Sequence, residues 1–425
     1  MIRRPAAVLA LLTALNLLNF VDRYVLAAVL PKVRDELLLS NFVSGLMATI
    51  FLVGYFTSSP VFGYLADRGR RTRLITFGIV VWSIATVASG LARTAPTLLF
   101  WRAVVGVGEA SFTAIAPTLI DDVSPPARKG RNLSIFYVAQ PIGAALGYLI
   151  GGAIEHAYGW RYAFYLAGGP GLLLGFACLL VAEPERGERE KPNIRNALGE
   201  LRASKQYRRA LLGYCAYTFA LGGFSYWAPT FLSDTFKVTL VTANFRFGLL
   251  TVVGGAVGTF LGGNLADRLQ ARATAHLGPA SEAPTEADTR RRVELEVAAL
   301  LKLCAVGSLI ATPIAAFCFL APSSNAFFGA AFFCEVALFL SMSPINAILL
   351  KSVPAHVRAS AMALAIFAIH LFGDLWSPPL VGILADFMPT RVAMLTLAVA
   401  FGLSGYLWWP RPRDLSDPEG ALAPA

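Results

Sequence analysis

The chain has 425 residues, of which 56% are hydrophobic and only 15% are charged. Soluble domains carry about 25% charged residues, so this composition excludes an ordinary soluble globular protein. Apolar runs of about 20 residues recur along the chain, and each is long enough to cross the hydrocarbon core of a bilayer as a helix. We therefore predict a multi-pass membrane protein in contact with the lipid bilayer.

The formal net charge of +10 does not indicate a nucleic-acid partner. If the N-terminus is cytoplasmic, Arg and Lys concentrate in the loops on the cytoplasmic side, as the positive-inside rule requires. We therefore expect no nucleic acid to bind, and we place both termini in the cytoplasm. The basic loops cover residues 68–73, 128–131, 183–209, 268–292 and 411–413.

Taken in chain order, the apolar runs predict an all-α membrane protein with twelve transmembrane helices in two sets of six. The predicted domains are an N-terminal six-helix bundle (1–182), a cytoplasmic linker (183–207), a C-terminal six-helix bundle (208–410) and a cytoplasmic tail (411–425). The linker should hold a short amphipathic helix with Leu198 and Leu201 toward the membrane. The predicted spans are 6–30, 41–66, 73–93, 96–121, 131–156, 161–182, 208–233, 242–267, 298–321, 325–350, 359–384 and 389–410.

The two halves share a short repeat. Gly63-Tyr-Leu-Ala-Asp67-Arg68 recurs as Gly263-Asn-Leu-Ala-Asp267-Arg268, at the cytoplasmic end of the second predicted helix of each half. The second half also carries an insertion over 269–297, where Thr285 is expected to cap a short helix. An internal repeat in a multi-pass protein is typical of a transporter whose halves move about a central site.

The segment 101–117 is apolar but contains Arg102 and Glu109 in its interior. An ionised side chain near the bilayer centre costs at least about 2.5–3.5 kcal/mol, so such residues normally face a cavity and belong to a substrate or proton path. Seven residues separate the two, so they share one face of a helix. Gly106 lies between them, where a neighbouring backbone or a ligand could approach. The alternative is a buried ion pair with a purely structural role.

Two further charges lie in the first predicted helix. Asp22 and Arg23 are adjacent, so they point about 100° apart and cannot face the same partner. Asp22 and Arg102 lie at similar depths, about 13 and 9 Å below the outer surface at 1.5 Å per residue, which predicts a pair between them. Arg23 shares a stripe with Asn16 and Asn19 and is left to reach Glu109 or an anionic head group.

Glu109 is the predicted proton carrier, with Asp22 and Arg102 as its partners in coupling. It lies about 20 Å deep in its helix. There, burial favours the neutral carboxylic acid, whereas a nearby arginine favours the carboxylate. A carboxyl whose protonation depends on the position of a cation can exchange a proton for a conformational change.

The second half offers fewer charged candidates. Glu335 is one, and His370 and Asp374 are spaced to share one helical face. His370 is equally compatible with a packing role. Tyr217 lies too deep for an interfacial aromatic belt and is expected to line the pocket, whereas Trp227 suits such a belt. The five cysteines have neither paired nor metal-ligand spacing, so we expect packing roles and no metal site.

The repeated segments resemble a known family. GYLADRGRR at 63–71 resembles the loop motif of the major facilitator superfamily, although Arg70 replaces its usual glycine, and Gly263–Arg268 is similar to the weaker second copy. Arg102-xxx-Gly106-x-Gly108 is similar to a fourth-helix motif of proton-linked members. The resemblance implies the major facilitator fold. It also implies a cytoplasmic gate latched by Gly63, Asp67, Arg68, Arg71, Gly263, Asp267 and Arg268.

A narrower resemblance concerns two segments. Asn19-Phe-Val-Asp22-Arg23-Tyr24 and GVGEASFTAIAPTLIDD at 106–122 are similar to the spinster subfamily, whose animal members are linked to movement of sphingosine-1-phosphate or lysophospholipids. Organic-anion uptake carriers of the same superfamily also have an Asn-x-x-Asp-Arg sequence in the first helix. The short N-terminal tail is typical of a bacterial inner-membrane member.

These observations predict a monomeric, proton-coupled transporter that works by alternating access, has no cofactor besides the proton, and carries an amphiphilic anionic lipid. The expected substrate-binding residues are Asn19, Arg23, Arg102, Glu109, Tyr217, Glu335, His370 and Asp374. The alternative is a proton-coupled symporter that imports a small organic anion, for which polar partners from both halves would be expected. A membrane enzyme or receptor is a minor alternative, since no nucleotide loop, metal cluster or paired nucleophile and base stands out.

Overall fold

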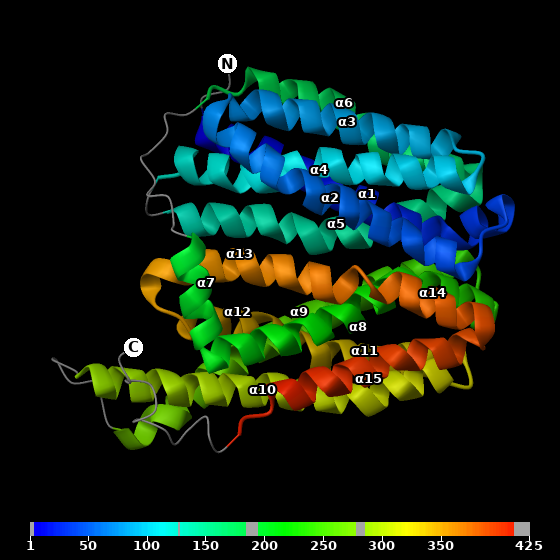
Figure 1. The fold of residues 1–425 in the computed structure, drawn as a ribbon. Coiled ribbons are helices and arrows are strands. Elements are labelled where there is room, and N and C mark those ends of the chain that lie inside the picture. Colours follow the sequence, from blue (N-terminus) through cyan, green and yellow to red (C-terminus); the bar gives the residue numbers. More distant parts are fainter. Residues whose placement is uncertain (1–3, 126–127, 184–193, 278–284, 412–425) are drawn as a thin grey trace. The chain divides into compact units, whose positions relative to one another are not determined.

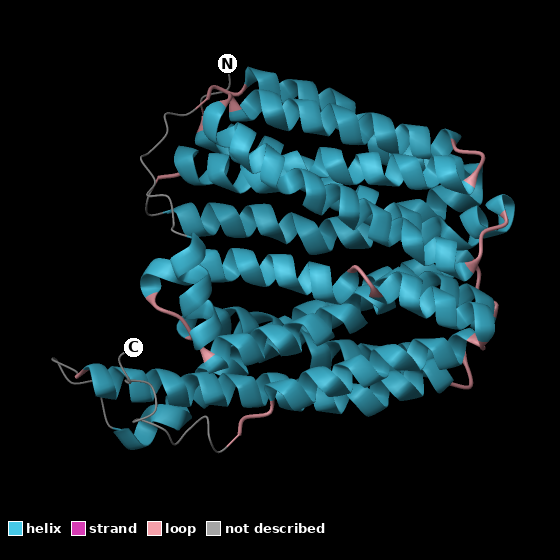
Figure 2. Ribbon diagram, in the orientation of Figure 1, coloured by secondary structure: helices cyan, strands magenta, loops and turns pink. Residues whose placement is uncertain are grey.

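The computed structural model describes residues 4–125, 128–183, 194–277 and 285–411, and within these ranges it contains helices and no strand (Figures 1 and 2). This confirms the predicted all-helical class. The first six membrane helices run side by side (Figure 1). They are α1 (Pro5–Leu37), α2 (Asn41–Arg68), α3 (Arg71–Leu91), α4 (Ala95–Val123), α5 (Lys129–Tyr158) and α6 (Trp160–Ala177).

The second set also comprises six spans, two of which are interrupted. The fourth of these is broken at Leu340 and Ser341, and the fifth contains a π-helical turn at His370–Asp374. Eleven helices of the described chain are long and apolar enough to cross a membrane, and α8, with 32 residues, supplies the twelfth span. The helices are α8 (Lys205–Phe236), α9 (Leu240–Thr274), α10 (Glu286–Leu320), α11 (Ser324–Phe339) with α12 (Met342–Lys351), α13 (Arg358–Ile369) with α14 (Ser377–Phe387), and α15 (Thr390–Trp408).

The chain forms two compact units. The first combines Met1–Arg189 with Phe224–Val252 and Pro378–Ala393, and the second holds Glu190–Gly223, Val253–Ser377 and Met394–Ala425. The first unit therefore includes the end of α8, the start of α9, nearly all of α14 and the start of α15 (Thr390–Trp408) in addition to α1–α6. This grouping follows contacts rather than the repeat, so the predicted domain boundaries remain predictions, and most of the predicted tail lies outside the described residues.

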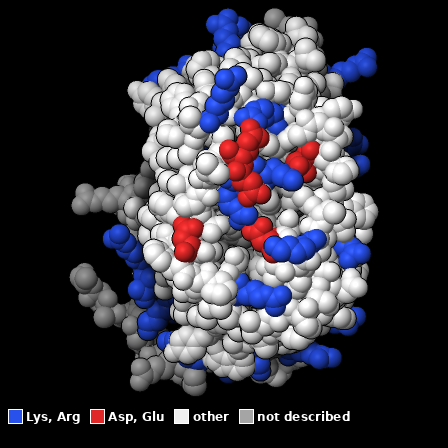
Figure 3. Space-filling model, turned by 90° about the vertical axis from the view of Figure 1, so that its right-hand side faces the viewer, with Lys and Arg blue, Asp and Glu red and all other residues white. Residues whose placement is uncertain are grey.

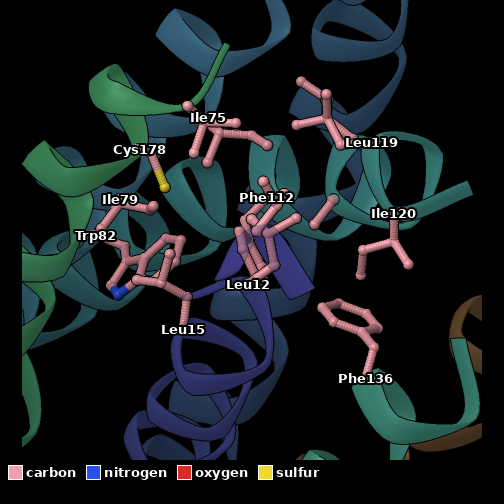
Figure 4. Close-up of a cluster of buried hydrophobic side chains, with 14 of the residues drawn as sticks. Leu12, Leu15, Ile75, Ile79, Trp82, Phe112, Leu119, Ile120, Phe136 and Cys178 are labelled. Atoms are coloured by element: carbon pink, nitrogen blue, oxygen red, sulfur yellow. The ribbon is translucent and has the colours of Figure 1, made fainter. Parts of the chain in front are cut away.

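In the first unit, α1 packs on α5, α2 on α4, and α3 on both α4 and α6. A buried apolar cluster fills the space between these helices (Figure 4). Burying each large apolar side chain contributes about 1.5–3 kcal/mol, so the cluster fixes the relative positions of α1, α3 and α4. Its labelled members are Leu12, Leu15, Ile75, Ile79, Trp82, Phe112, Leu119, Ile120, Phe136 and Cys178.

Two glycines bring α2 and α4 into close contact. A methyl group added to Gly54 would collide with the Ala103 carbonyl, and one added to Gly106 would meet the Phe51 carbonyl and the Tyr55 amide. Backbone atoms cannot rotate away as side chains do, so only glycine fits at this crossing. The approach predicted at Gly106 is therefore made by the backbone of α2.

In the second unit, α10 packs on α11 and α12. The predicted linker helix is present as α7 (Ile194–Ala203), but its orientation differs from the prediction. Leu201 is buried and α7 packs on α13, with a Glu200–His356 contact of 3.1 Å. Leu201 therefore faces protein rather than lipid.

In its described parts, 269–277 and 285–297, the insertion does not form the separate short helix that the sequence suggested. Its start continues α9, and its end is the first part of α10, a single helix of 35 residues. Thr285 does cap this helix, because its side chain accepts a hydrogen bond from the Asp288 amide. All five cysteines are buried, which agrees with packing roles.

Candidate functional site

The first pair of charges joins α1 and α4, as predicted from their depths. Asp22 and Arg102 approach to 3.8 Å between Oδ1 and Nη1, and both residues are buried. This distance allows an ion pair but exceeds hydrogen-bond range. The hydroxyl of Thr86 on α3 donates to the other oxygen of Asp22. Asp22 is thus held by α3 and only loosely engaged by Arg102.

The second pair also joins α1 and α4. Nε of Arg23 donates to Oε2 of Glu109 at 2.7 Å, which confirms one of the two partners expected for Arg23. Glu109 is fully buried, whereas 19% of the Arg23 side chain is exposed. We call Asp22, Arg23, Arg102 and Glu109 the charge quartet. Its members alternate as predicted, since adjacent Asp22 and Arg23 engage different partners.

Aromatic rings line the charge quartet. The Phe51 ring lies 5.1 Å from the guanidinium carbons of both Arg23 and Arg102. Phe20 and Tyr55 place their rings 5.0 and 5.4 Å from Arg23. A cation near an aromatic face gains about 0.5–2 kcal/mol, depending on desolvation. Phe51 is therefore an apolar neighbour shared by both arginines, whereas Phe20 and Tyr55 contact Arg23 alone.

Sequence reasoning missed these rings and Thr86. The run around Phe51 and Tyr55 is uniformly apolar, so it looks like any lipid-facing helix. Comparing depths along the helices, as was done for Asp22 and Arg102, does not show which helices are neighbours. The aromatic residues of α2 could be placed near the arginines only once the glycine contacts between α2 and α4 were known.

Asn16 and Asn19 extend the polar stripe of α1. The Asn16 side-chain amide donates to the Phe136 carbonyl at 2.8 Å, which ties α1 to α5. Asn19 is fully buried one turn away. Asn16 thus has a structural partner, whereas Asn19 belongs to the neighbourhood of the charge quartet.

The second unit holds three of the candidates, two of which are paired. His370 and Asp374 are paired through Nδ1 and Oδ2 at 2.8 Å, which confirms that they share a face. They form the π-helical turn and remain about one-quarter to one-third exposed. Glu335 is buried, and an added methyl group at Gly254 of α9 would meet its side chain. Their functions remain predictions.

Two of the aromatic side chains singled out in the sequence are buried inside the protein. Tyr217 is buried against Phe401 and Trp408, and its hydroxyl donates to the Leu338 carbonyl at 3.2 Å. This is a packing position, and a pocket-lining role for Tyr217 remains a prediction. Trp227 is fully buried and donates to the Pro378 carbonyl at 2.9 Å, so it does not belong to an interfacial belt.

The residues of the predicted gate motif differ in their surroundings. Asp67, Arg68, Asp267 and Arg268 are exposed, and Arg68 stacks on Tyr64 at 3.7 Å. Gly63 and Gly263 are not forced by crowding, since an added methyl group meets nothing within 3.4 Å at either position.

Arg71 is buried and binds inside its own helix set. It contacts Asp122 at 2.6 Å and Glu183 at 3.1 Å. These contacts connect the start of α3 to the end of α4 and to the segment that follows α6. Burial by itself raises the pKa of Glu183, but hydrogen bonds from Thr72 and Arg71 outweigh it and lower the pKa below its ordinary value. Arg71 therefore has a structural role in holding these three segments together, in addition to any role in the gate.

Comparison with known proteins agrees with this arrangement. The family model described as Major Facilitator Superfamily matches residues 12–280, more than half of the chain. The chain therefore belongs to the major facilitator superfamily, a class of membrane transporters.

Within that superfamily the curated relatives are spinster proteins. Protein spinster homolog 3 of Danio rerio is 33% identical over 418 residues, which cover 90% of this chain and 77% of the relative. Protein spinster homolog 1 of Homo sapiens is 34% identical over 411 residues, with 90% and 73% covered. A probable sphingolipid transporter, spinster homolog 2 of Arabidopsis thaliana, is 31% identical over 446 residues, with 95% and 86% covered. The protein is a transporter of the spinster type, not an enzyme.

A solved structure has the same fold. It is a bacterial homolog of the human lysosomal transporter Spinster in an inward-facing, unoccupied conformation. It superposes with a TM-score of 0.81 at 23% identity and covers 96% of this chain and 97% of its own.

Proposed function

We propose that this spinster-type transporter works by alternating access, is coupled to protons, and carries an amphiphilic anionic lipid of the sphingolipid or lysophospholipid type. One observation carries the proposal, namely the charge quartet buried among α1–α4. Intramembrane ionisable groups are costly and mark substrate or proton paths. No resident cofactor is required, because the proton is the coupling ion.

The charges of the quartet balance when both carboxyls are ionised. Two arginines then face two carboxylates, in pairs at 2.7 and 3.8 Å. If either carboxyl takes up a proton, the cluster gains one net positive charge in a medium where charges interact strongly. An anionic head group can restore the balance. Proton binding and anion binding therefore favour each other, which is the linkage a coupled transporter needs.

We assign Glu109 as the proton carrier and Asp22 and Arg102 as coupling partners. Among the described residues, Nε and Nη1 of Arg102 make no hydrogen bond, so Arg102 retains donors that a phosphate or carboxylate can accept. Arg23 is the more exposed arginine, and Asn19 lies one turn from it. These residues suit the head group.

The uneven distribution of charge favours a lipid over a small acid. The buried cations of the described chain, Arg71 and Arg102, both belong to the first six helices. A small organic anion would be expected to need polar partners from the second set as well, whereas a lipid tail needs only apolar surface. The Arabidopsis relative is named a probable sphingolipid transporter. Import of a small organic anion remains the alternative, in which Glu335, His370 and Asp374 would supply polar contacts.

We further propose that the protein acts as a monomer in a bacterial inner membrane with both termini in the cytoplasm. The basic loops support this orientation, because the Gly63–Arg71 loop and the 183–209 segment then lie on the cytoplasmic side.

Transport in proteoliposomes tests the substrate class. Labelled lysophospholipids and sphingosine-1-phosphate would be compared with small organic acids, using wild type, Arg102→Gln, and Arg93→Gln as a matched control on an exposed loop. We expect lipid transport that Arg102→Gln abolishes and Arg93→Gln leaves intact. Transport of the small acids alone would establish the alternative.

A further inference from the structure

A third copy of the repeated segment lies near the end of the chain. Gly382-Ile-Leu-Ala-Asp386 has the same G-x-L-A-D pattern as 63–67 and 263–267. The first copy ends α2, and the third ends α14. Asp386 contacts the start of α2, whereas Asp67 lies at its other end, about 39 Å away at 1.5 Å per residue. The third copy therefore serves the end of α2 opposite to the motif already assigned to a gate.

Asp386 caps α2. One carboxylate oxygen accepts from the Asn41 amide at 2.8 Å and the other from the Phe42 amide at 3.0 Å. The Ser40 side chain accepts from the next amide, that of Val43. The first N–H groups of a helix have no partner within the helix, and a negative charge at this end also interacts favourably with the helix dipole. Asp386 thus satisfies two amides that α2 cannot satisfy itself.

A second set of polar contacts surrounds the cap. Arg34 of α1 binds both carboxylate oxygens of Asp234 on α8, at 2.7 and 3.1 Å, and also donates to the Asn41 side chain at 3.3 Å. The Asn41 side-chain amide in turn donates to the Ala385 carbonyl at 3.3 Å. Asn41 therefore joins α1, α2 and α14. Figure 3 looks onto this end of the molecule and shows acidic and basic side chains gathered there.

Glycine permits the approach that these contacts require. A methyl group on Gly382 of α14 would collide with the Asn41 carbonyl, and one on Gly45 of α2 would collide with the Pro378 carbonyl. The glycine and the aspartate of the third G-x-L-A-D copy thus both act on the same turn of α2. Gly382 lets the two helices approach because it has no side chain, and Asp386 supplies the cap.

We propose that Asp386 is the latch of a second gate, at the end of α2 opposite to the Gly63–Arg71 segment. When this end is closed, its carboxylate holds α14 on the first turn of α2. When the end opens, the two amides pass to water. The proposal rests on alternating access, not on the identity of the substrate or on proton coupling. In transport, Asp67 and Asp386 would latch opposite ends of the same helix.

The rate at which a buried thiol is labelled tests the latch. Ser44 is fully buried beside the cap, so a Ser44→Cys variant reacts with a hydrophilic maleimide only when this end opens. Purified full-length protein in detergent would be used, and the protein without Ser44→Cys gives the background from the five buried native cysteines. Adding Asp386→Asn removes the charge and one of the two accepting oxygens, so it should raise the labelling rate about fivefold, which corresponds to about 1 kcal/mol, the usual net worth of one hydrogen bond.

Three variants serve as controls. Asp67→Asn is the same substitution at the other end of α2 and should lower the rate or leave it unchanged. Asp35→Asn removes a charge at the same end from a side chain that is 68% exposed, and should stay within twofold of the parent. Gly382→Ala wedges the end open without changing any charge and should raise the rate.

The outcomes decide the proposal. If Gly382→Ala raises labelling but Asp386→Asn matches Asp35→Asn, the end opens and Asp386 does not latch it. If Gly382→Ala has no effect, this end does not open and there is no gate for Asp386 to latch. Should Asp386→Asn fail to fold, Asp386→Ser also removes the charge and one accepting oxygen in a smaller side chain, and an unchanged labelling rate in that variant contradicts the proposal equally.

Discussion

The pairing of Arg23 with Glu109 makes a quantitative prediction about stability. Glu109→Gln removes a fully buried carboxylate that lies 2.7 Å from Arg23. Breaking a buried ion pair by removing one partner costs about 3–5 kcal/mol, because the other charge stays buried without compensation. Arg23 is partly exposed and surrounded by three rings, so we expect the lower end, about 3 kcal/mol. Arg23→Gln should cost about as much, because Glu109 is then the uncompensated charge.

The double variant separates a pair from two independent sites. With both charges removed, no buried charge remains uncompensated, so the total cost should be about 3–4 kcal/mol rather than the sum of about 6. Reversible unfolding in mixed detergent micelles measures all three variants. The partly exposed pair Lys129–Asp121, at 3.0 Å, is the control and should show a coupling below about 1 kcal/mol. Costs for Arg23 and Glu109 that add within about 0.5 kcal/mol would refute the pairing.

Two other substitutions test single assignments. Tyr217→Phe should lower the free energy of unfolding by about 1 kcal/mol through loss of the bond to Leu338, with transport unchanged. A raised KM at unchanged stability would instead place Tyr217 in the pocket. Glu183 has a pKa below its ordinary value of 4.5, so the stability it contributes is present above that value and disappears as the pH falls through the lower, folded-state pKa. Glu183→Gln should therefore destabilise the protein at pH 7 by about 1 kcal/mol and match wild type in strong acid, as unfolding curves at several pH values would reveal. An equal difference at every pH would contradict this role.

Much of the charge quartet could be predicted from the sequence because helix geometry is regular. Depth along α1 and α4 follows from the rise per residue, and adjacent Asp22 and Arg23 must point apart. This was enough to pair Asp22 with Arg102 and to bring Arg23 within reach of Glu109. The superfamily was predictable for a different reason, since its loop motif combines glycine, aspartate and arginine at fixed spacing in both halves.

The remaining features depend on packing between helices, which periodicity does not encode. In the sequence, Tyr217 resembles a pocket residue and Trp227 resembles a residue of an interfacial belt. Only their neighbours in the structure show that both are buried inside the protein. The rings of Phe51 and Tyr55 reach the arginines because Gly54 and Gly106 allow close contact of α2 and α4. Similarly, the third G-x-L-A-D segment is visible in the sequence, but its partner, the first turn of α2, lies more than 300 residues away.

The central claim is that the buried charge quartet couples proton movement to transport. Proton flux into proteoliposomes, driven by a lysolipid or by sphingosine-1-phosphate, tests it most directly in wild type, Glu109→Gln, and Glu155→Gln as the matched control near the end of α5. We predict a lipid-dependent proton flux that Glu109→Gln abolishes and Glu155→Gln preserves. A flux that survives Glu109→Gln unchanged would show that Glu109 is not the proton carrier, and lipid transport without any proton flux would contradict proton coupling itself.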